Sequence, residues 1–443
     1  MPEPVDIAAK LAEPKTYERT LLRIFGKKRE RGQAFRETYC GVTYFGTASN
    51  RKKLAKIIAK SVVAGQYHPR PVDLWYLETE GKRRAAHEAG FVDHVVASSL
   101  CQLLTHNAIC YGMPGVYSYL PGRTNTQAAR DLGTFVRKHR RRVGPRGGPV
   151  YIIQSDFEAY GDNLPMDHNA ALWPILREVA SLGASNGELD SKTWDLIISL
   201  ARPTVRDEGG TEFQRLRGVA MGTPLVPILS DLAVLPMDRA IQSIDGVFYA
   251  RYNDDFVIAH PDLDALHEAD ARIDALLDEL GVKRKLAKEL RTALCANGIG
   301  SEQDPAYRGR QRIDYLGLSI THAGTITVNP RRLRRFIGRI ATRIDGVRPA
   351  LSSLPLPERA RQLVVTTNVM LDARSPFAVP GLAAVLDNVT DRGSLKDLDF
   401  RIARKIVQAA TGLPGVKGFR QLPPSVLRGE MGLVSLVRLR NSR

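Results

Sequence analysis

Cysteine is scarce in this sequence, and its few cysteines are not spaced like metal ligands. Cys40, Cys101, Cys110 and Cys295 are widely separated, and no C-x-x-C pair occurs. Structural zinc sites and disulfide frameworks both need several cysteines at characteristic spacings. We therefore expect neither a structural zinc site nor a disulfide framework.

Long apolar runs are also missing. No uninterrupted stretch approaches the ~20 apolar residues that a helix needs to span a bilayer. The first residues, MPEPVDIAAKLAEP, contain acids and lack an apolar core, so they do not predict a signal peptide. We expect a cytoplasmic protein that does not enter the membrane.

Acidic residues are too few to balance the basic ones. Asp and Glu number 47 against 64 Lys and Arg, a formal charge of +17 over 443 residues. This excess favours a polyanionic partner, nucleic acid first and an anionic membrane surface second. Binding to nucleic acid should weaken steeply with salt, because phosphates release their counterions on binding. Charge alone does not distinguish an enzyme acting on nucleic acid from a passive binder.

The sequence is organised around residues 248–260, FYARYNDDFVIAH. Two runs of β-forming residues flank Asn253-Asp254-Asp255, a pattern typical of a hairpin. The turn would carry two adjacent carboxylates, which repel each other unless solvent or a cation intervenes, and Asp oxygens suit Mg²⁺. A solvated Asx turn is the alternative interpretation of the same residues.

A further acid follows an apolar stretch. Residues 149–154, PVYIIQ, predict a strand buried on both faces, and Asp156 comes just after it. An acid at this place either caps the strand or acts as a metal ligand. Residues 331–344 predict a basic amphipathic helix that contains Arg335 and Arg339. Such a helix is solvated, tracks nucleic acid or lies on a membrane surface.

Taken in order, several stretches resemble the motifs of bacterial reverse transcriptases, the family of the group II intron and retron enzymes. The resemblance covers about residues 66–340. The matching stretches are Gly81–Arg84 with VDHVV at 92–96, Tyr117–Arg123 with Gln127-Ala128-Ala129, Asp156, Gly218–Asp231, Tyr252–Asp255 as the Y-x-D-D box, Leu280-Gly281 with Lys288, and Tyr315-Leu316-Gly317.

The resemblance implies an α+β fold of the right-hand polymerase type. A helical extension would cover residues 1–50, and the fingers about 51–148. The palm, a small antiparallel sheet backed by helices, would cover 149–325 with finger helices inserted at about 164–215. Residues 326–443 would form a helical thumb and C-terminal region.

The resemblance also implies RNA-directed DNA synthesis with dNTPs at a primer 3′-hydroxyl. Polymerases of this kind use two Mg²⁺ ions about 3.5–4 Å apart, with Mn²⁺ as a substitute. Asp156 and Asp254 would bridge the metals, Asp255 would support the site, and Phe157 would add its backbone carbonyl. Lys288 would lie near the pyrophosphate leaving group; a solvated lysine is the alternative.

The remaining site residues follow from the same motifs. Bidentate phosphate contacts suit arginine, so the basic turn would hold the triphosphate. The expected nucleotide-contacting residues are Lys82, Arg83, Arg84, Tyr160, Gly161, Met221, Gly222 and Lys288. The expected primer or template contacts are Arg123, Tyr252, Tyr315, Leu316, Gly317, Arg335 and Arg339.

The chain departs from the family pattern at two of these positions. Gly161 stands where relatives carry an aromatic that blocks a 2′-hydroxyl, and Tyr160 lies one position earlier. Either Tyr160 swings into that gate, so that Tyr160→Ala would relax a dNTP preference, or sugar discrimination is weak. Met221 replaces a glutamine, which removes hydrogen-bonding groups near the template base. Untemplated synthesis is therefore an alternative to templated synthesis.

The region after about residue 345 shows no endonuclease or RNase H pattern. In this it is most similar to the compact reverse transcriptases of antiphage defence, which implies a dedicated non-coding RNA as template and a DNA product. A catalytically silent nucleic-acid-binding scaffold is the alternative from another functional class. The sequence leaves open whether a second copy or a partner protein binds.

Overall fold

Helices dominate the structure, with small sheets between them. A computed structural model describes residues 2–38, 41–79, 81–144 and 147–441, so Cys40 lies outside the described residues. The chain divides into two compact units, residues 1–124 with 153–290 and residues 125–152 with 291–443. The predicted α+β class is confirmed. The predicted bounds of fingers, palm and thumb stay a prediction.

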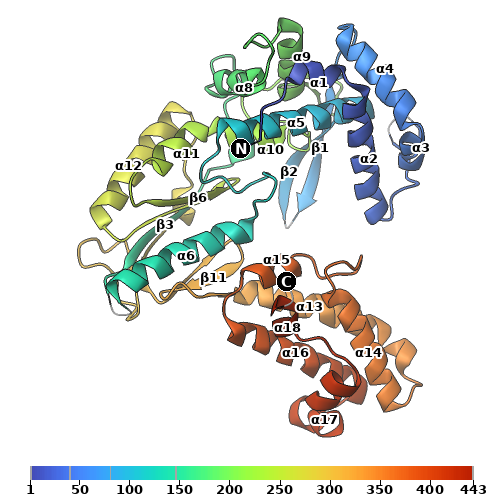
Figure 1. Cartoon of the computed structure of the whole chain (residues 1–443), viewed down its shortest axis with the longest axis vertical. Coiled ribbons are helices and arrows are strands. Elements are labelled where there is room, and N and C mark those ends of the chain that lie inside the picture. Colours follow the sequence, from blue (N-terminus) through green and yellow to red (C-terminus); the bar gives the residue numbers. More distant parts are fainter. Residues whose placement is uncertain (1, 39–40, 80, 145–146, 442–443) are drawn as a thin grey trace. The chain divides into compact units, whose positions relative to one another are not determined.

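In the colours of Figure 1, α6 (Asn125–Val143) is teal but belongs to the second unit, whereas the elements of the first unit run from blue to yellow. They are α1 Ile7–Ala12, α2 Pro14–Glu30, α3 Tyr44–Ser49, α4 Arg51–Val63, β1 Val72–Thr79, β2 Lys82–Glu88, α5 Phe91–Tyr111, α7 Tyr160–Asn163, α8 Leu172–Ser181, α9 Ser191–Ala201, β4 Thr204–Arg206, β5 Glu212–Gln214, α10 Val226–Ala233, α11 Leu235–Gln242, β6 Phe248–Tyr252, β7 Asp255–His260, α12 Leu263–Glu279 and η1 Leu286–Lys288.

The second unit is mainly helical. Its elements are α6 Asn125–Val143, β9 Arg308–Arg310, β10 Arg312–Tyr315, β11 Leu318–Thr321, β12 Ile326–Val328, α13 Pro330–Val347, η2 Pro349–Leu351, α14 Leu356–Leu371, α15 Leu382–Asn388, α16 Arg392–Thr411, α17 Gly415–Gln421, η3 Val426–Glu430 and α18 Leu436–Asn441. Strands β3 Val150–Asp156 and β8 Leu290–Leu294 contain residues of both units.

Three sheets organise the strands. The largest has the order β6-β7-β3-β8-β9, and the others have the orders β2-β1-β4-β5 and β10-β11-β12. In the first unit α11 packs on β6 and α12 on β7, so helices cover the hairpin (Figure 1). Because helices cover the hairpin, its strands are mainly apolar. Its residues Ala250, Phe256, Val257 and Ile258 are fully buried.

The hairpin predicted at residues 248–260 is confirmed. Strands β6 and β7 are antiparallel, and Tyr252 pairs with Asp255, which leaves Asn253-Asp254 as a two-residue turn. Asn253 has a φ of 60°, a left-handed conformation that Asn adopts more readily than most residues. The turn residues thus explain why the chain reverses here, immediately before Asp255.

Two predicted elements differ from the structure. The apolar sequence at about 227–241 predicts a single helix, but it is divided into α10 and α11 around Val234, because Pro236 lacks the N–H that a continuous helix requires. Residues 313–320 and 325–328 predict the two strands of one hairpin, but 313–320 is itself a hairpin, β10–β11, and β12 adds a third strand. Its turn uses Leu316 and Gly317, both at positive φ.

Candidate active site

Strand β3 and the β6–β7 hairpin bring two carboxylates together in the first unit. The Phe157 N–H, one residue beyond Asp156, donates to the Asp254 carbonyl oxygen at 3.2 Å. The side chains of Asp156 and Asp254 are close enough for the charge of one to affect the other. Burial, followed by the neighbouring Asp156 charge, raises the pKa of Asp254. This is the electrostatic pattern of two neighbouring, partly buried carboxylates.

Asp255 adds negative charge beside this pair. Burial, and then the charges of Asp254 and Asp156, raise the pKa of Asp255 to about 6. Beneath the carboxylates, the Phe157 ring packs against Phe256 and Tyr160, with centroid separations of 5.3 and 4.9 Å. This apolar floor excludes water from one side of the acids and contributes to their raised pKa values.

The segment 283–289 holds the other side of Asp156. Its Lys285 N–H donates to the Asp156 carbonyl at 2.7 Å, and the Lys288 ammonium contacts Asp156 Oδ2 at 2.7 Å. The hydrogen bond to Asp156, and then its charge, raise the pKa of Lys288. The Lys288 side chain is 60% exposed, so it can move aside when another cation or a ligand arrives.

Buried Arg284 fixes this segment. Its guanidinium contacts Asp270 at 2.7 Å on α12 and Glu289 at 2.6 Å in the same segment. Its Nε donates to Ser155 Oγ at 3.5 Å, next to Asp156. In the sequence Arg284 is part of a basic run with Lys283 and Lys285, and neither its spacing nor its neighbours mark it as buried.

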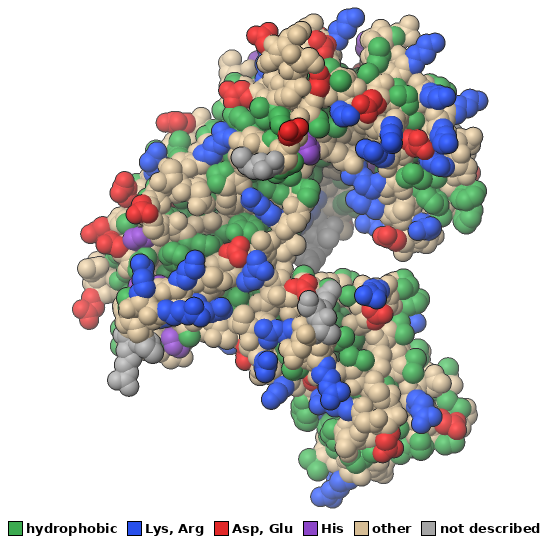
Figure 2. Space-filling view, in the orientation of Figure 1, with side chains coloured by type: hydrophobic (Ala, Val, Ile, Leu, Met, Phe, Trp, Pro, Cys, Tyr) green, Lys and Arg blue, Asp and Glu red, His purple; other side chains and the backbone are tan. Residues whose placement is uncertain are grey.

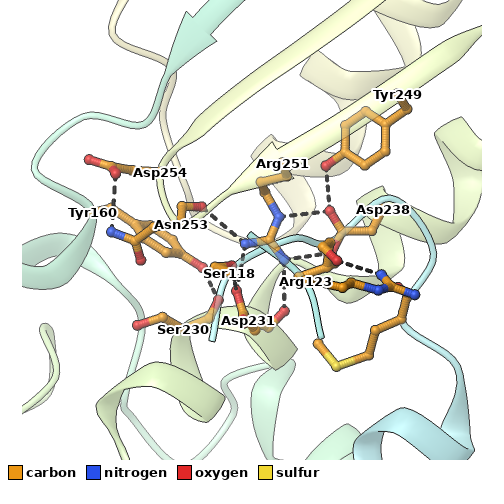
Figure 3. Close-up of polar contacts among 12 residues, drawn as sticks. Ser118, Arg123, Tyr160, Ser230, Asp231, Asp238, Tyr249, Arg251, Asn253 and Asp254 are labelled. Carbon is orange, nitrogen blue, oxygen red and sulfur yellow. Dashed lines mark hydrogen bonds and ion pairs between the residues drawn. The ribbon is translucent and has the colours of Figure 1, made fainter. Parts of the chain in front are cut away.

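A second buried arginine fixes the hairpin (Figure 3). Arg251, on β6, is completely buried and makes a bidentate contact with Asp238 of α11, at 2.8 and 2.7 Å. It also donates to Asp231 Oδ1 and to the Asn253 carbonyl, both at 3.0 Å, and to the Asp231 carbonyl at 3.2 Å. All five guanidinium N–H groups therefore have acceptors, and one of these acceptors lies in the turn before Asp254.

The carboxylates of this cluster differ in their surroundings. Tyr249 donates to Asp238 Oδ1, and Ser118 donates to Asp231 Oδ1 at 2.6 Å. Asp231 Oδ2 is buried without a hydrogen-bond partner. Burial disfavours the charged form of Asp231 and raises its pKa to about 6. The single charge of Arg251, which also faces Asp238, offsets only part of this effect. No sequence motif predicts this cluster; its charged residues stand out only because the strand and the two helices that carry them are mainly apolar.

The residues expected to contact a nucleotide lie in different environments. Tyr160 is 5% exposed and its hydroxyl donates to the Ser230 carbonyl, so its side chain points into the protein interior, and its contact with a nucleotide stays a prediction. Gly161 and Met221 are adjacent, since a Cβ on Gly161 would lie 2.9 Å from the Met221 sulfur. Gly222, at a φ of 106°, is packed against the His87 carbonyl, where a Cβ would lie 2.6 Å away.

The two arginines of the expected triphosphate clamp lie on opposite faces of a hairpin. Arg83 stands opposite Glu78 and Arg84 opposite Leu77, so consecutive side chains point to opposite faces of the β1–β2 hairpin. Arg83 lies on the same face of the hairpin as His87. The backbone N–H of His87 donates to the Met221 carbonyl oxygen at 2.6 Å. Arg84 faces the other way. The Lys82 side chain lies outside the described residues.

Of the expected primer or template contacts in the first unit, Arg123 is used internally. It donates to the carbonyls of Met113 and Val116 at 2.8 and 2.5 Å, in the segment before it. Tyr252 lies beside Tyr119 with a centroid separation of 6.4 Å. Tyr119 is 52% exposed, and these two rings form an aromatic surface next to the hairpin turn.

The other expected contacts come together in the second unit. Tyr315, Leu316, Gly317, Arg335 and Arg339 line a groove of about 680 Å³ with Arg331 and Arg332. The Arg332 guanidinium crosses over the β10–β11 turn, since a Cβ on Gly317 would lie 2.9 Å from its Nη1. Burial lowers the pKa of Arg332. The groove therefore combines a tight turn with four arginines of α13.

A metal ion fits the carboxylate pair. Asp156 Oδ1 is buried and has no hydrogen-bond partner, and burial and the Asp156 charge raise the pKa of Asp254. Within the described residues, no group of three or more His, Cys, Asp or Glu side chains could hold a metal alone. Mg²⁺ in phosphoryl-transfer sites commonly takes one or two carboxylates, with water and substrate phosphates completing its shell.

The other predicted absences can be compared only in the described part of the chain. There, Cys101, Cys110 and Cys295 form no disulfide. Among the helices described, none combines the length and the apolar character needed to cross a membrane.

Comparisons with known proteins give only distant similarities. No family model and no curated protein matches the chain. A solved structure of telomerase from Candida albicans, in complex with a TWJ fragment of telomeric RNA, is similar over 86% of this chain, with 12% identity and a TM-score of 0.47. Apo telomerase from Candida tropicalis is similar over 82%, with 12% identity and a TM-score of 0.46.

A viral enzyme shows a similarity of the same order. An insertion-loop deletion mutant of the RNA-dependent RNA polymerase of a human picobirnavirus is similar over 84% of this chain, with 11% identity and a TM-score of 0.44. This chain spans 66%, 67% and 64% of the three solved chains, respectively. No residue role is taken from them.

Proposed function

We propose that the chain is a nucleic-acid polymerase that transfers a nucleotidyl group to a primer 3′-hydroxyl, and that it copies RNA into DNA from dNTPs. One observation carries this proposal. Asp156 and Asp254, from elements far apart in the sequence, meet with a buried carboxylate oxygen that has no hydrogen-bond partner. Opposed carboxylates that need cations are the usual basis of two-metal phosphoryl transfer.

The residues of the site would share the work as follows. Asp156 and Asp254 would hold two Mg²⁺ ions, or Mn²⁺ in their place, with Asp255 and the Phe157 carbonyl alongside. Bound metal ions would activate the attacking hydroxyl and neutralise the triphosphate. Arg83 would bind the triphosphate, because it shares a face with His87 and the Met221 segment. Lys288 would move from Asp156 to the leaving pyrophosphate and contact it through its ammonium group.

The finer parts of the proposal rest on the resemblance of the sequence to bacterial reverse transcriptases. The template would be a dedicated non-coding RNA, the product DNA, and the role antiphage defence in the cytoplasm. The right-hand arrangement, and the groove of Arg335 and Arg339 as a primer and template contact, belong to the same proposal. Burial of Tyr160 favours weak discrimination between dNTPs and rNTPs, the second of the two alternatives at Gly161.

Untemplated DNA synthesis is the second candidate, and Met221 favours it. Its thioether is 39% exposed beside Gly161, at a position where the family carries an amide. A thioether offers a template base only a weak acceptor, whereas an amide both donates and accepts.

The test is to sequence the nucleic acid that co-purifies with the protein, before and after addition of Mg²⁺ and dNTPs. The matched proteins are Asp254→Asn, which should abolish synthesis, and Asp278→Asn, an exposed acid on α12 that should not affect it. New DNA complementary to one bound RNA would support templated synthesis. New DNA of simple sequence without an RNA match would support the second candidate. Equal DNA synthesis by Asp254→Asn and wild type would overturn the proposed site.

A further inference from the structure

Three phenylalanines gather on the surface of the first unit, away from any core. Phe45 of α3 lies between Phe25 of α2 and Phe35 of the following loop, with centroid separations of 6.2 and 5.4 Å. Phe35 is 74% exposed and Phe45 is 48% exposed. Clustered rings at such exposure are uncommon on a protein that uses them only for packing, and they point to a binding surface.

Cations are interleaved with these rings. Lys28 Nζ lies 4.7 Å from the Tyr44 ring centroid, and the Arg29 guanidinium lies 5.9 Å from that of Phe25. Residues 21–60 contain eleven Lys and Arg and only two acids, Glu30 and Glu37. Figure 2 shows basic and hydrophobic side chains intermingled over α2, α3 and α4. The ligand of this surface should therefore be anionic and should also offer flat apolar groups.

The surface continues onto the β1–β2 hairpin. Lys28 and Tyr44 line a pocket of about 360 Å³ together with Trp75 and Leu77 of β1. Trp75 is 40% exposed and Leu77 is 44% exposed. Arg84 pairs with Leu77 across the strands and so lies on this face. This placement puts Arg84 on the opposite face of the hairpin from Arg83.

We propose that this aromatic–basic surface, formed by Phe25, Lys28, Phe35, Tyr44, Phe45, Trp75 and Arg84, binds single-stranded nucleic acid. Exposed rings stack on unpaired bases, while nearby cations contact the phosphates. A duplex hides the faces of its bases and would use only the cations. The surface shares no residue with the carboxylate site, and Arg84 is its only member that the sequence also predicts to contact a nucleotide, so the inference stands independently of the proposed polymerase activity.

The arrangement favours nucleic acid over a membrane. Interfacial helices separate an apolar face from a charged face, so that the apolar face alone enters the lipid. Here the cations stand over the rings themselves, and the rings belong to several elements. That mixture suits a ligand in which bases and phosphates alternate.

The experiment measures binding of a fluorescent single-stranded RNA of about 20 nucleotides by anisotropy, in EDTA to prevent synthesis. The test variant is Phe35→Leu with Phe45→Leu, which keeps apolar side chains but removes two rings. We expect its affinity to fall about tenfold or more, given the usual contribution of base stacking. The control Phe377→Leu, at a ring 59% exposed beside Arg343, should bind like wild type.

Three comparisons decide the outcome. Unchanged affinity of the double variant, with its fold verified by circular dichroism, would overturn the inference. An equal loss on duplex RNA of the same sequence would also overturn it, because stacking would not be the cause. Ring-dependent binding to phosphatidylcholine–phosphatidylserine vesicles, without an effect on RNA, would favour a membrane instead. Because binding is measured in EDTA, its outcome does not depend on the proposed catalysis.

Discussion

At the scale of single residues, the Lys288 ammonium neutralises the charge of Asp156, as a bound metal ion would. Its ammonium lies 2.7 Å from Asp156 Oδ2, so a divalent cation has to bind next to a positive charge. We expect Lys288→Met to lower the Mg²⁺ concentration needed for half-maximal thermal stabilisation about fivefold, because one nearby repulsion is removed. Titrating Mg²⁺ while recording the melting temperature measures this.

The matched control for this titration is Lys283→Met. Lys283 is an exposed lysine in the same segment, and within the described residues it has no ion pair. It should leave the Mg²⁺ midpoint unchanged. A midpoint for Lys288→Met equal to or higher than that of wild type would show that Lys288 does not compete with the metal.

Asp231 gives a prediction about pH. Burial raises its pKa to about 6, above an ordinary value of 3.8. The folded protein therefore binds this proton more tightly than the unfolded chain. The stabilisation that results is complete below about pH 4 and is lost as the pH rises to about 6. Asp231→Asn removes this dependence. The free energy of unfolding of the variant, relative to that of wild type, should therefore rise over that pH range by up to about 3 kcal/mol.

Urea unfolding of both proteins from pH 4 to 7 tests the prediction. The other acids titrate in both proteins and cancel in the difference, and Asp278→Asn serves as the exposed control. Parallel stability curves for wild type and Asp231→Asn would mean that Asp231 is ionised throughout the range.

At the scale of elements, the Arg251 cluster joins β6 to α10 and α11. We expect Arg251→Met to lower the free energy of unfolding by about 3–5 kcal/mol, because two buried carboxylates lose their cation. Replacing Asp231 and Asp238 by Asn in the same protein should recover part of the loss, since no unpaired charge then remains. Urea unfolding measures both effects.

An exposed arginine provides the comparison. Arg206 pairs with Glu212 at 3.0 Å but is 43% exposed, so Arg206→Met should cost less than about 1 kcal/mol. If Arg251→Met is no more destabilising than Arg206→Met, the buried cluster does not hold the hairpin in place.

The elements predicted from the sequence were those with a strong local pattern. The β6–β7 hairpin followed from β-forming runs around Asn253-Asp254, and β1 was predicted with its observed bounds. The break at Val234 and the Leu316-Gly317 turn were missed, because an apolar stretch gives the same pattern with or without an interruption.

The site shows the same limit. Asp156 and Asp254 could be identified from motifs, since each stands in a recognisable local context. The burial of Tyr160, Arg251 and Arg284 could not, because it depends on which elements pack around them. Polar residues are usually exposed, so their sequence neighbours gave no reason to place them in the core.

At the scale of the whole molecule, the charge of +17 should dominate nucleic-acid affinity. In the second unit, Arg335 and Arg339 line one groove and are candidates for phosphate contact. We expect Arg335→Gln with Arg339→Gln to reduce the slope of log affinity against log salt by about 1 to 2 for an RNA–DNA hybrid. Anisotropy at several salt concentrations measures the slope.

Arg401 supplies a control elsewhere in the same unit. It is exposed on α16 and pairs with Asp397 at 2.8 Å. Arg401→Gln should leave the slope unchanged. Equal slopes for the double variant and wild type would exclude the groove as a phosphate contact.

The saturated donors of Arg251 also limit how this protein can evolve. Every N–H of its guanidinium is engaged, by Asp231, Asp238 and the Asn253 carbonyl, in a place without water access. Lineages that lose the arginine first, or one acid first, pass through an ancestor with an unbalanced buried charge. The three positions should therefore be inherited and replaced as a set. Close relatives that keep both acids without the arginine would contradict this.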